Sequence, residues 1–305
     1  MINLSKNGFS HTCRALALTA AAVAALTGPA LANGFTEDVG SSERVNFSGQ
    51  LGTLSERITA AACNLSAGIA TIESQAVLNI STFHFTRINR ALLEGNRGMG
   101  ILGEESRPRT LRAISELNAK WEPLRDMANA TPVGAQDRAY VENLANQSEP
   151  VQEEAKILVS EITGQYADPA VLQHADAMLL EIAGRQRMLA NRISKDVCLI
   201  ASDVNNDTAL AQLNESIQLF DVSLQALQNG METVGIRPPP TEQIAQGLAD
   251  VGIAVDGIRP ILQAAQGGQE LSDEDRAKVF RAMLGVEAKM NNVVHWYQQN
   301  SKLNL

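Results

Sequence analysis

The sequence predicts an all-α protein built from two tandem antiparallel four-helix bundles. Aromatic residues make up only 4% of the 305 residues, while Ala, Leu, Ile, Gln and Glu are abundant, and this composition favours helices over sheets. Similar stretches recur in the two halves of the chain. Each copy contains four amphipathic segments joined by short loops, which close most simply as an antiparallel bundle.

The repeat is clearest where residues 49–58 align with residues 184–193 at an offset of 135. The other matches, two of them after small gaps, are Cys63 with Cys198, Gly95 with Gly230, Pro123 with Pro260 and Asp137 with Asp275. Several matches in one order indicate an internal duplication. We therefore expect one domain over residues 42–165 and a second over residues 169–303.

The expected helices span residues 42–66, 74–95, 108–130 and 132–165 in the first copy and 169–203, 207–231, 241–265 and 272–300 in the second. Asp168-Pro169 and Thr131-Pro132 each place an N-cap before a first-turn proline. Ser272 followed by Asp275 resembles a capping box. The expected helix ends are Gly95 and Gly230, and the expected kinks or breaks are at Pro123, Pro150 and Pro260.

The segment 1–32 has the features of an export signal. Lys6 and Arg14 are basic, an apolar run follows, and positions 30–32 form a small-x-small cleavage site. The alternative is a membrane anchor, but the apolar run is short and is followed by Gly28 and Pro29. We expect cleavage after Ala32 and a soluble protein in the periplasm or outside the cell.

The charge of the chain argues against a nucleic-acid partner. The formal net charge is −9, and cleavage would make it more negative because it removes two positive charges. Binding to a phosphate backbone instead needs a concentrated basic surface. The three His of the mature chain, His84, His174 and His295, have no metal-ligand spacing. No nucleotide-binding or hydrolase motif is present, so we expect no enzyme activity, no cofactor and no metal.

The first helix of each copy carries a second face of small and polar residues, in addition to its apolar core face. Its members are Gly49, Gly52, Glu56, Thr59 and Cys63 in the first copy and Gly184, Arg187, Asn191, Ser194 and Cys198 in the second. Spacings of three and four place each set on one side of a helix. This pattern favours a helix–helix contact between the copies or between two chains, and the alternative is a solvated face.

If the two copies pack through these faces, Cys63 and Cys198 could meet and form a disulfide, which an oxidising compartment would permit. The alternative is two buried free thiols, which helical cores often contain.

The most specific string is residues 183–195, AGRQRMLANRISK. It resembles the signature of the type IV pili methyl-accepting chemotaxis transducer N-terminal domain, the PilJ type, which is related to the sensor regions of NarX-like nitrate/nitrite receptors. Residues 45–49 and 54–58 resemble a degraded second copy. The resemblance implies a four-helix sensor bundle that dimerises through its first helix, where an Arg from each partner holds one nitrate or nitrite.

By motif position that Arg corresponds to Arg187, with Gly184, Met188 and Asn191 beside it as the expected ligand-binding residues. The first copy has Gly52 in the equivalent place, so two Arg could face one anion only if two chains paired through their second copies. A guanidinium suits a planar oxyanion. The alternative partner of Arg187 is an internal acid such as Glu56. Arg57 and Arg192 are expected to make structural contacts.

These inferences predict a periplasmic, non-enzymatic ligand-binding or sensory accessory protein. The implied ligand is a small anion such as nitrate or nitrite, the implied partner is a membrane-bound signalling protein, and a homodimer is an open alternative. The competing hypothesis is a helical scaffold for protein interaction that has lost its ligand.

Overall fold

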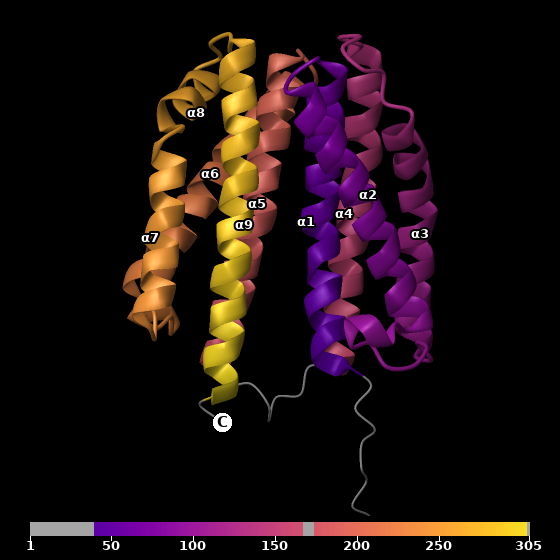
Figure 1. Ribbon diagram of the computed structural model, residues 1–305, viewed down its shortest axis with the longest axis vertical. Coiled ribbons are helices and arrows are strands. Elements are labelled where there is room, and N and C mark those ends of the chain that lie inside the picture. Colours follow the sequence, from indigo (N-terminus) through magenta and orange to yellow (C-terminus); the bar gives the residue numbers. More distant parts are fainter. Residues whose placement is uncertain (1–39, 167–173, 304–305) are drawn as a thin grey trace, which may run out of the picture. The chain divides into compact units, whose positions relative to one another are not determined.

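The computed structural model describes residues 40–166 and 174–303, and within them the regular elements are all helices (Figure 1). The order is α1 (Ser41–Ser66), α2 (Thr71–Glu94), η1 (Arg97–Met99), α3 (Pro108–Asn129), α4 (Arg138–Tyr166), α5 (His174–Ala201), α6 (Asn206–Asn229), η2 (Glu232–Val234), α7 (Glu242–Asp256), α8 (Arg259–Gln266) and α9 (Asp273–Leu303), η marking a 3-10 helix. The all-α expectation is confirmed. The export signal and Asp168-Pro169 lie outside the described residues.

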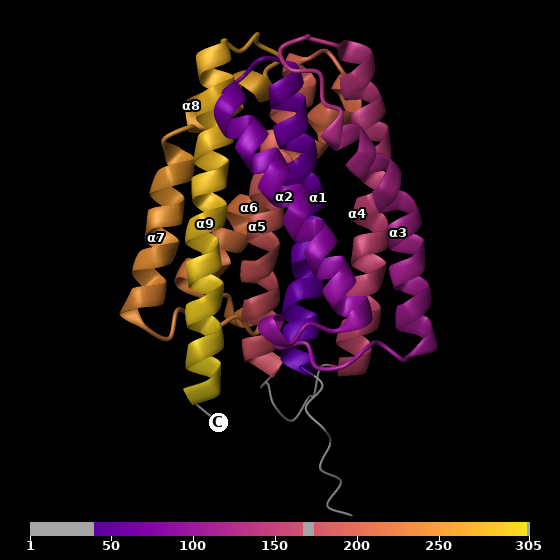
Figure 2. The ribbon, with the colours of Figure 1, turned by 45° about the vertical axis from the view of Figure 1, so that its right-hand side comes forward.

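The helices enclose two apolar cores. The first core lies among α1 to α4, where Phe85 stacks on Trp121 with ring centroids 4.0 Å apart. The second core lies among α5 to α9. α1 and α5 lie side by side in Figures 1 and 2, each a central helix of its own group. The two cores follow the division into residues 42–165 and 169–303, which stays a prediction because residues 38–305 form one compact unit.

Several elements recur at the offset of the sequence repeat. α2 and α6, η1 and η2, and the bridges Asn96–Ile101 and Met231–Ile236 share this spacing. Gly95 and Gly230 end their helices at φ of 79° and 77°, as expected. A side chain at Gly95 would also collide with the Gly103 carbonyl oxygen, 2.6 Å from an added Cβ, so glycine is required there on two grounds.

The start of α4 corrects the Thr131-Pro132 prediction. α4 begins at Arg138, after the intervening loop binds back to the end of α1. The Gly134 N–H donates to the Leu65 carbonyl at 3.0 Å and the Gln136 N–H to the Ser66 carbonyl at 2.8 Å. Because a helix end leaves its last carbonyls without partners, these residues satisfy α1 instead of forming a first turn.

The proline positions have different outcomes. The helix expected over residues 241–265 is two helices, because the chain breaks at Ile258 and Pro260 lies in the first turn of the next helix. α3 continues through Pro123 and α4 through Pro150, so no break occurs at either. The capping box is confirmed, since the Asp275 N–H donates to the Ser272 hydroxyl at 3.1 Å. None of the helices in the described ranges is long and apolar enough to cross a membrane.

Candidate functional site at the junction of α1 and α5

The small and polar faces of α1 and α5 are turned toward the junction between the two helix groups. Glu56, Thr59 and Cys63 are buried on α1, and Asn191, Ser194 and Cys198 are buried on α5. The expected helix–helix contact is therefore made within one chain. It also covers the α5 face through which two chains would have to pair.

The two glycines on this face of α1 border open space. Gly49 is exposed and Gly52 is half-buried, and a Cβ added at either would meet no atom within 4 Å. Close approach of a neighbouring helix therefore does not require glycine at these two positions. The space beside Gly52 would accept a larger side chain.

A disulfide between Cys63 and Cys198 joins α1 to α5 near their C-terminal ends. The two Cα atoms lie 6.2 Å apart, and the sequence separation is 135. Both residues are buried. The bond fixes one end of the junction covalently.

A buried ionic cluster crosses the junction in the C-terminal half of α5. One Glu56 carboxylate oxygen accepts from Arg192 Nε and the other lies by Lys195 Nζ, each at 2.9 Å. The Arg192 Nη2 also donates to Gln152 Oε1 on α4 at 2.7 Å. Burial alone would raise the pKa of Glu56, but the attraction of Lys195 and Arg192 lowers it, so Glu56 is ionised.

Lys195 and Asp196 complete this cluster and were missed from the sequence. Lys195 Nζ lies 3.4 Å from the half-exposed Glu149 and 3.6 Å from an oxygen of Asp196. Asp196 is fully buried, neither of its oxygens has a hydrogen-bond partner among the described residues, and burial raises its pKa to about 7. The available signal was an adjacent Lys-Asp pair between the core residues Ile193 and Val197.

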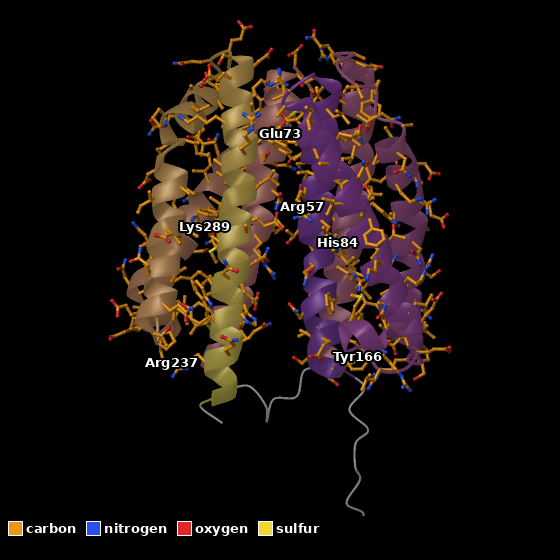
Figure 3. The ribbon with its side chains drawn as sticks, in the orientation of Figure 1. Arg57, Glu73, His84, Tyr166, Arg237 and Lys289 are labelled. Atoms are coloured by element: carbon orange, nitrogen blue, oxygen red, sulfur yellow. A yellow bond between two sulfur atoms is a disulfide. The ribbon has the colours of Figure 1, made fainter. Side chains whose placement is uncertain are left out.

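A second polar cluster lies on the opposite side of the same junction. Arg57 reaches from α1 toward α9 (Figure 3), donating to Glu287 Oε1 at 2.8 Å and to the Ser81 hydroxyl. Asn191 of α5 donates to the other oxygen of Glu287 at 2.8 Å. Arg57 and Arg192, which align with each other in the sequence repeat, thus make the structural contacts expected of them.

Arg187 is a buried cation of this face, and no carboxylate from the described residues is bound to it. Only 8% of its surface is exposed. Its Nη1 donates to Asn291 Oδ1 at 2.9 Å, and its Nε donates weakly to the Gly184 carbonyl at 3.4 Å. Burial lowers the pKa of Arg187, with a smaller opposing attraction from Glu287.

The suggestion that Glu56 neutralises Arg187 is wrong, because Glu56 is bound to Arg192 and Lys195. In the described parts of the chain, Arg187 has no ion pair and its Nη2 makes no hydrogen bond. This nitrogen lies 3.4 Å from the Cβ position of Gly184. A guanidinium in this state retains a donor for an added acceptor.

The other expected ligand-binding residues are used differently. Gly184 contributes only its carbonyl to Arg187. Met188 is half-buried and faces α4, where Gln152 Nε2 lies 3.7 Å from its sulfur. Asn191 is occupied by the Arg187 carbonyl and by Glu287. The structure therefore groups Arg187 with Gly184 and Asn291, and Asn291 was not anticipated.

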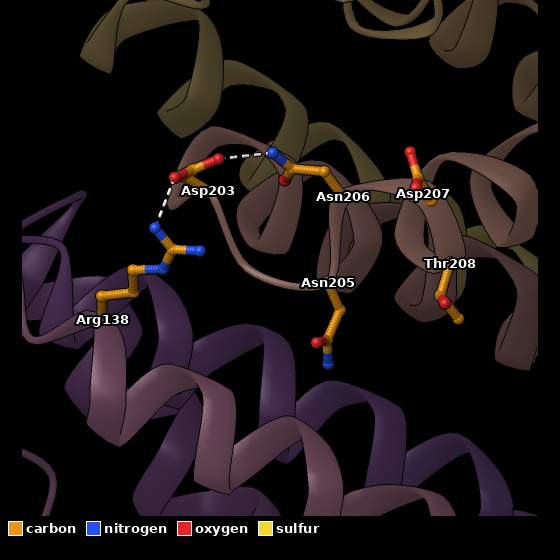
Figure 4. A pocket seen from close by; sticks show the side chains of 6 residues that line it. All are labelled: Arg138, Asp203, Asn205, Asn206, Asp207 and Thr208. Carbon is orange, nitrogen blue, oxygen red and sulfur yellow. Dashed lines mark hydrogen bonds and ion pairs between the residues drawn. The ribbon is translucent and has the colours of Figure 1, made fainter.

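Two hollows lie away from Arg187. One of about 400 Å³ is lined by Arg138, Asp203, Asn205, Asn206, Asp207 and Thr208 (Figure 4). Its Arg138 is already paired with Asp203. The other, of about 330 Å³, lies between α4, α5 and α6 and borders Lys195 and Glu149. In the described residues, no group of three His, Cys, Asp or Glu could hold a metal ion.

Comparison with known proteins identifies one domain. No curated protein matches the chain. Residues 172–279, which include α5 with Arg187, match the family described as the type IV pili methyl-accepting chemotaxis transducer N-terminal domain. The chain thus contains a PilJ domain over residues 172–279, and PilJ domains are sensory domains of chemotaxis transducers.

Proposed function

We propose that the protein is an exported, non-enzymatic sensory accessory protein that binds a small planar oxyanion at Arg187. The observation that carries this proposal is a buried guanidinium whose hydrogen-bond acceptors, Asn291 and the Gly184 carbonyl, are both neutral. A buried charge without a counter-charge is unfavourable. Glu287 attracts Arg187 without binding it, so an anion would supply a bound counter-charge and the acceptor for Nη2.

Nitrate and nitrite are the anions that the resemblance to NarX-like sensors implies. Both are planar, and a guanidinium offers several donors in one plane. The site we propose contains one Arg, because Gly52 takes the equivalent place on α1 and α1 covers the α5 face where a second chain would pair. One Arg in place of two predicts weaker binding than a symmetric pair would give.

Anion binding would change the junction that holds the two helix groups together. Arg187 lies on the same face of α5 as Asn191, which binds Glu287 and through it Arg57 of α1. An anion bound to Arg187 would therefore lie close to the Asn191–Glu287 and Arg57–Glu287 hydrogen bonds, which join the two helix groups. We propose that a membrane-bound signalling protein detects this change in the periplasm.

The experiment is thermal unfolding of the purified chain with nitrate, nitrite and chloride. Ligand at a hundredfold its Kd should add about 2.7 kcal/mol, which raises Tm by roughly 5 °C or more in a chain of this size. Arg187→Ala should abolish the shift. Arg185→Ala is the matched control, because Arg185 is exposed and pairs with Glu181 on the same helix. A shift that survives Arg187→Ala would refute the assignment.

Gly52→Arg gives a gain-of-function test. A Cβ at Gly52 meets no atom within 4 Å, so a side chain can begin there without a clash. It would place a second guanidinium opposite Arg187 and should tighten nitrate binding. Unchanged or weaker binding in a folded Gly52→Arg chain would contradict the location of the site.

A scaffold without a ligand is the second candidate. The observation in its favour is the density of direct contacts across the junction, where a disulfide and two ionic clusters already join α1, α4, α5 and α9. On this view no anion changes Tm, and Arg187→Ala raises the stability of the chain because it removes a buried charge.

A further inference from the structure

α2 carries two apolar faces. Its inner face packs into the first core through residues that include Leu78, Phe85 and Leu92. Its outer face carries Ile72, Ile80 and Phe83, which are 83%, 56% and 62% exposed, with the exposed Ala76 between them. Spacings of three and four place these four residues in one stripe, opposite the core. Among the helices of residues 40–166 and 174–303, none lies in front of α2 in Figure 2.

The four corresponding positions of α6 carry no large apolar residue. α6 is the counterpart of α2 in the sequence repeat, and its residues at the four stripe positions are Asp207, Ala211, Glu215 and Gln218. The fold therefore does not need an apolar outer face at this place. Because isolated exposed apolar residues are common but an aligned set is not, the α2 stripe indicates a surface that another molecule covers.

We propose that the α2 stripe is the interface with a second copy of this chain, with the two α2 helices antiparallel. A twofold axis at the level of Leu78 places Ala76 against Ile80 of the second copy and Ile72 against Phe83. In such a symmetric pairing each contact occurs twice. The small Ala76 lies near the axis, where the helices approach most closely.

The charges at the two ends of the stripe fit this pairing. Beyond Phe83 the same face continues with the exposed Arg87 and Arg90. The other end carries Glu73, which is 47% exposed on its side chain and pairs with Arg281. With the axis at Leu78, Glu73 of each copy lies level with Phe83 of the other. Arg87 lies about one turn further along and its long side chain leans back toward that level. Opposite charges at both ends favour the antiparallel direction of the pairing.

A lipid surface fits the stripe less well. Arg87 and Arg90 lie in line with the apolar residues on α2, not on both flanks, as a helix lying in a membrane interface requires. The chain also carries a net charge of −9, which an anionic bilayer would repel. One helix pair buries little surface compared with a standard interface. The dimer should therefore be weak and should dissociate on dilution.

Sedimentation velocity of the purified chain over a range of concentrations tests the proposal. We expect monomer and dimer in exchange, and Ile80→Glu with Phe83→Glu should lower the association constant at least about tenfold. Val222→Glu on α6 is the control, because Val222 is also 50% exposed but lies outside the stripe. A chain that stays monomeric at every concentration, or a dimer that persists in the double variant, would overturn the proposal.

Thiol crosslinking locates the axis independently. Ala76→Cys and Ala211→Cys are a matched pair, since both alanines are exposed and occupy equivalent positions on α2 and α6. A short bis-maleimide should link two Ala76→Cys chains and leave Ala211→Cys chains monomeric. Equal crosslinking of the two variants would refute an interface on α2.

Discussion

Glu56→Gln should destabilise the protein more than its small change in shape suggests. The Glu56 side chain is 3% exposed and binds two cations at 2.9 Å, Arg192 and Lys195. The amide keeps the size of the side chain but removes its charge. Lys195, whose side chain is 2% exposed, then keeps only the buried Asp196 and the half-exposed Glu149 nearby among the described residues.

The magnitude follows from the burial of the pair. Removing one partner of a buried ion pair costs about 3–5 kcal/mol, because the other charge stays buried. The amide oxygen can still accept one hydrogen bond, so we expect the lower end, about 3 kcal/mol. At about 2–4 °C per kcal/mol for a chain of this size, Tm should fall by roughly 6–12 °C.

Differential scanning calorimetry at neutral pH measures this change, and Glu149→Gln is its matched control. Glu149 approaches the same Lys195 Nζ at 3.4 Å, but its side chain is 49% exposed. Exposed pairs contribute below about 1 kcal/mol, so this variant should shift Tm by no more than roughly 4 °C. Equal shifts in the two variants would refute the view that burial makes Glu56 important.

Three further predictions concern the core and the junction. Replacing Cys63 and Cys198 by Ala should lower the free energy of unfolding by about 2–5 kcal/mol, because the disulfide closes a long loop. Intact mass before and after reduction establishes the disulfide. Two free thiols in the native chain would exclude it. Asp196 has a pKa raised from 3.8 to about 7, so the stability that its protonated form contributes is fully present at acid pH and is lost as pH rises through about 7. Asp196→Asn should therefore be stabilising at pH 8 and nearly neutral at pH 4 in urea unfolding, and the opposite order would contradict the burial of an ionised carboxylate. Trp121→Ala should cost about 3–5 kcal/mol, because Trp121 is 2% exposed and stacks on Phe85; a loss below about 1 kcal/mol would show that the ring is not packed.

The helices were predictable because their signals are local. Apolar spacing, the capping pair Ser272–Asp275 and the glycines that end α2 and α6 each act within a few residues of the element they define. The predicted helix start at Thr131-Pro132 was wrong because of a contact with a residue far away in the sequence. The loop there donates hydrogen bonds to the last carbonyls of α1. α2 and α3 lie between α1 and this loop in the sequence, so no local pattern predicts the contact.

The site was predictable only in part for a related reason. Spacing placed Arg187 on one face with Asn191 and Cys198, and the structure keeps that face together. The assignment of partners needed the tertiary fold. Arg57 and Arg192 align in the sequence repeat, yet Arg192 pairs with Glu56 on α1 and Arg57 pairs with Glu287 on α9. Asn291, the acceptor nearest to Arg187, lies 104 residues away on α9 and belongs to no motif.

Isothermal titration of nitrate and nitrite into the chain tests the central claim most directly. We predict saturable binding of one anion per chain in the wild type, none in Arg187→Ala, and unchanged binding in Arg185→Ala. Absence of binding in a folded wild-type chain, or equal binding in Arg187→Ala, would contradict an oxyanion site at Arg187.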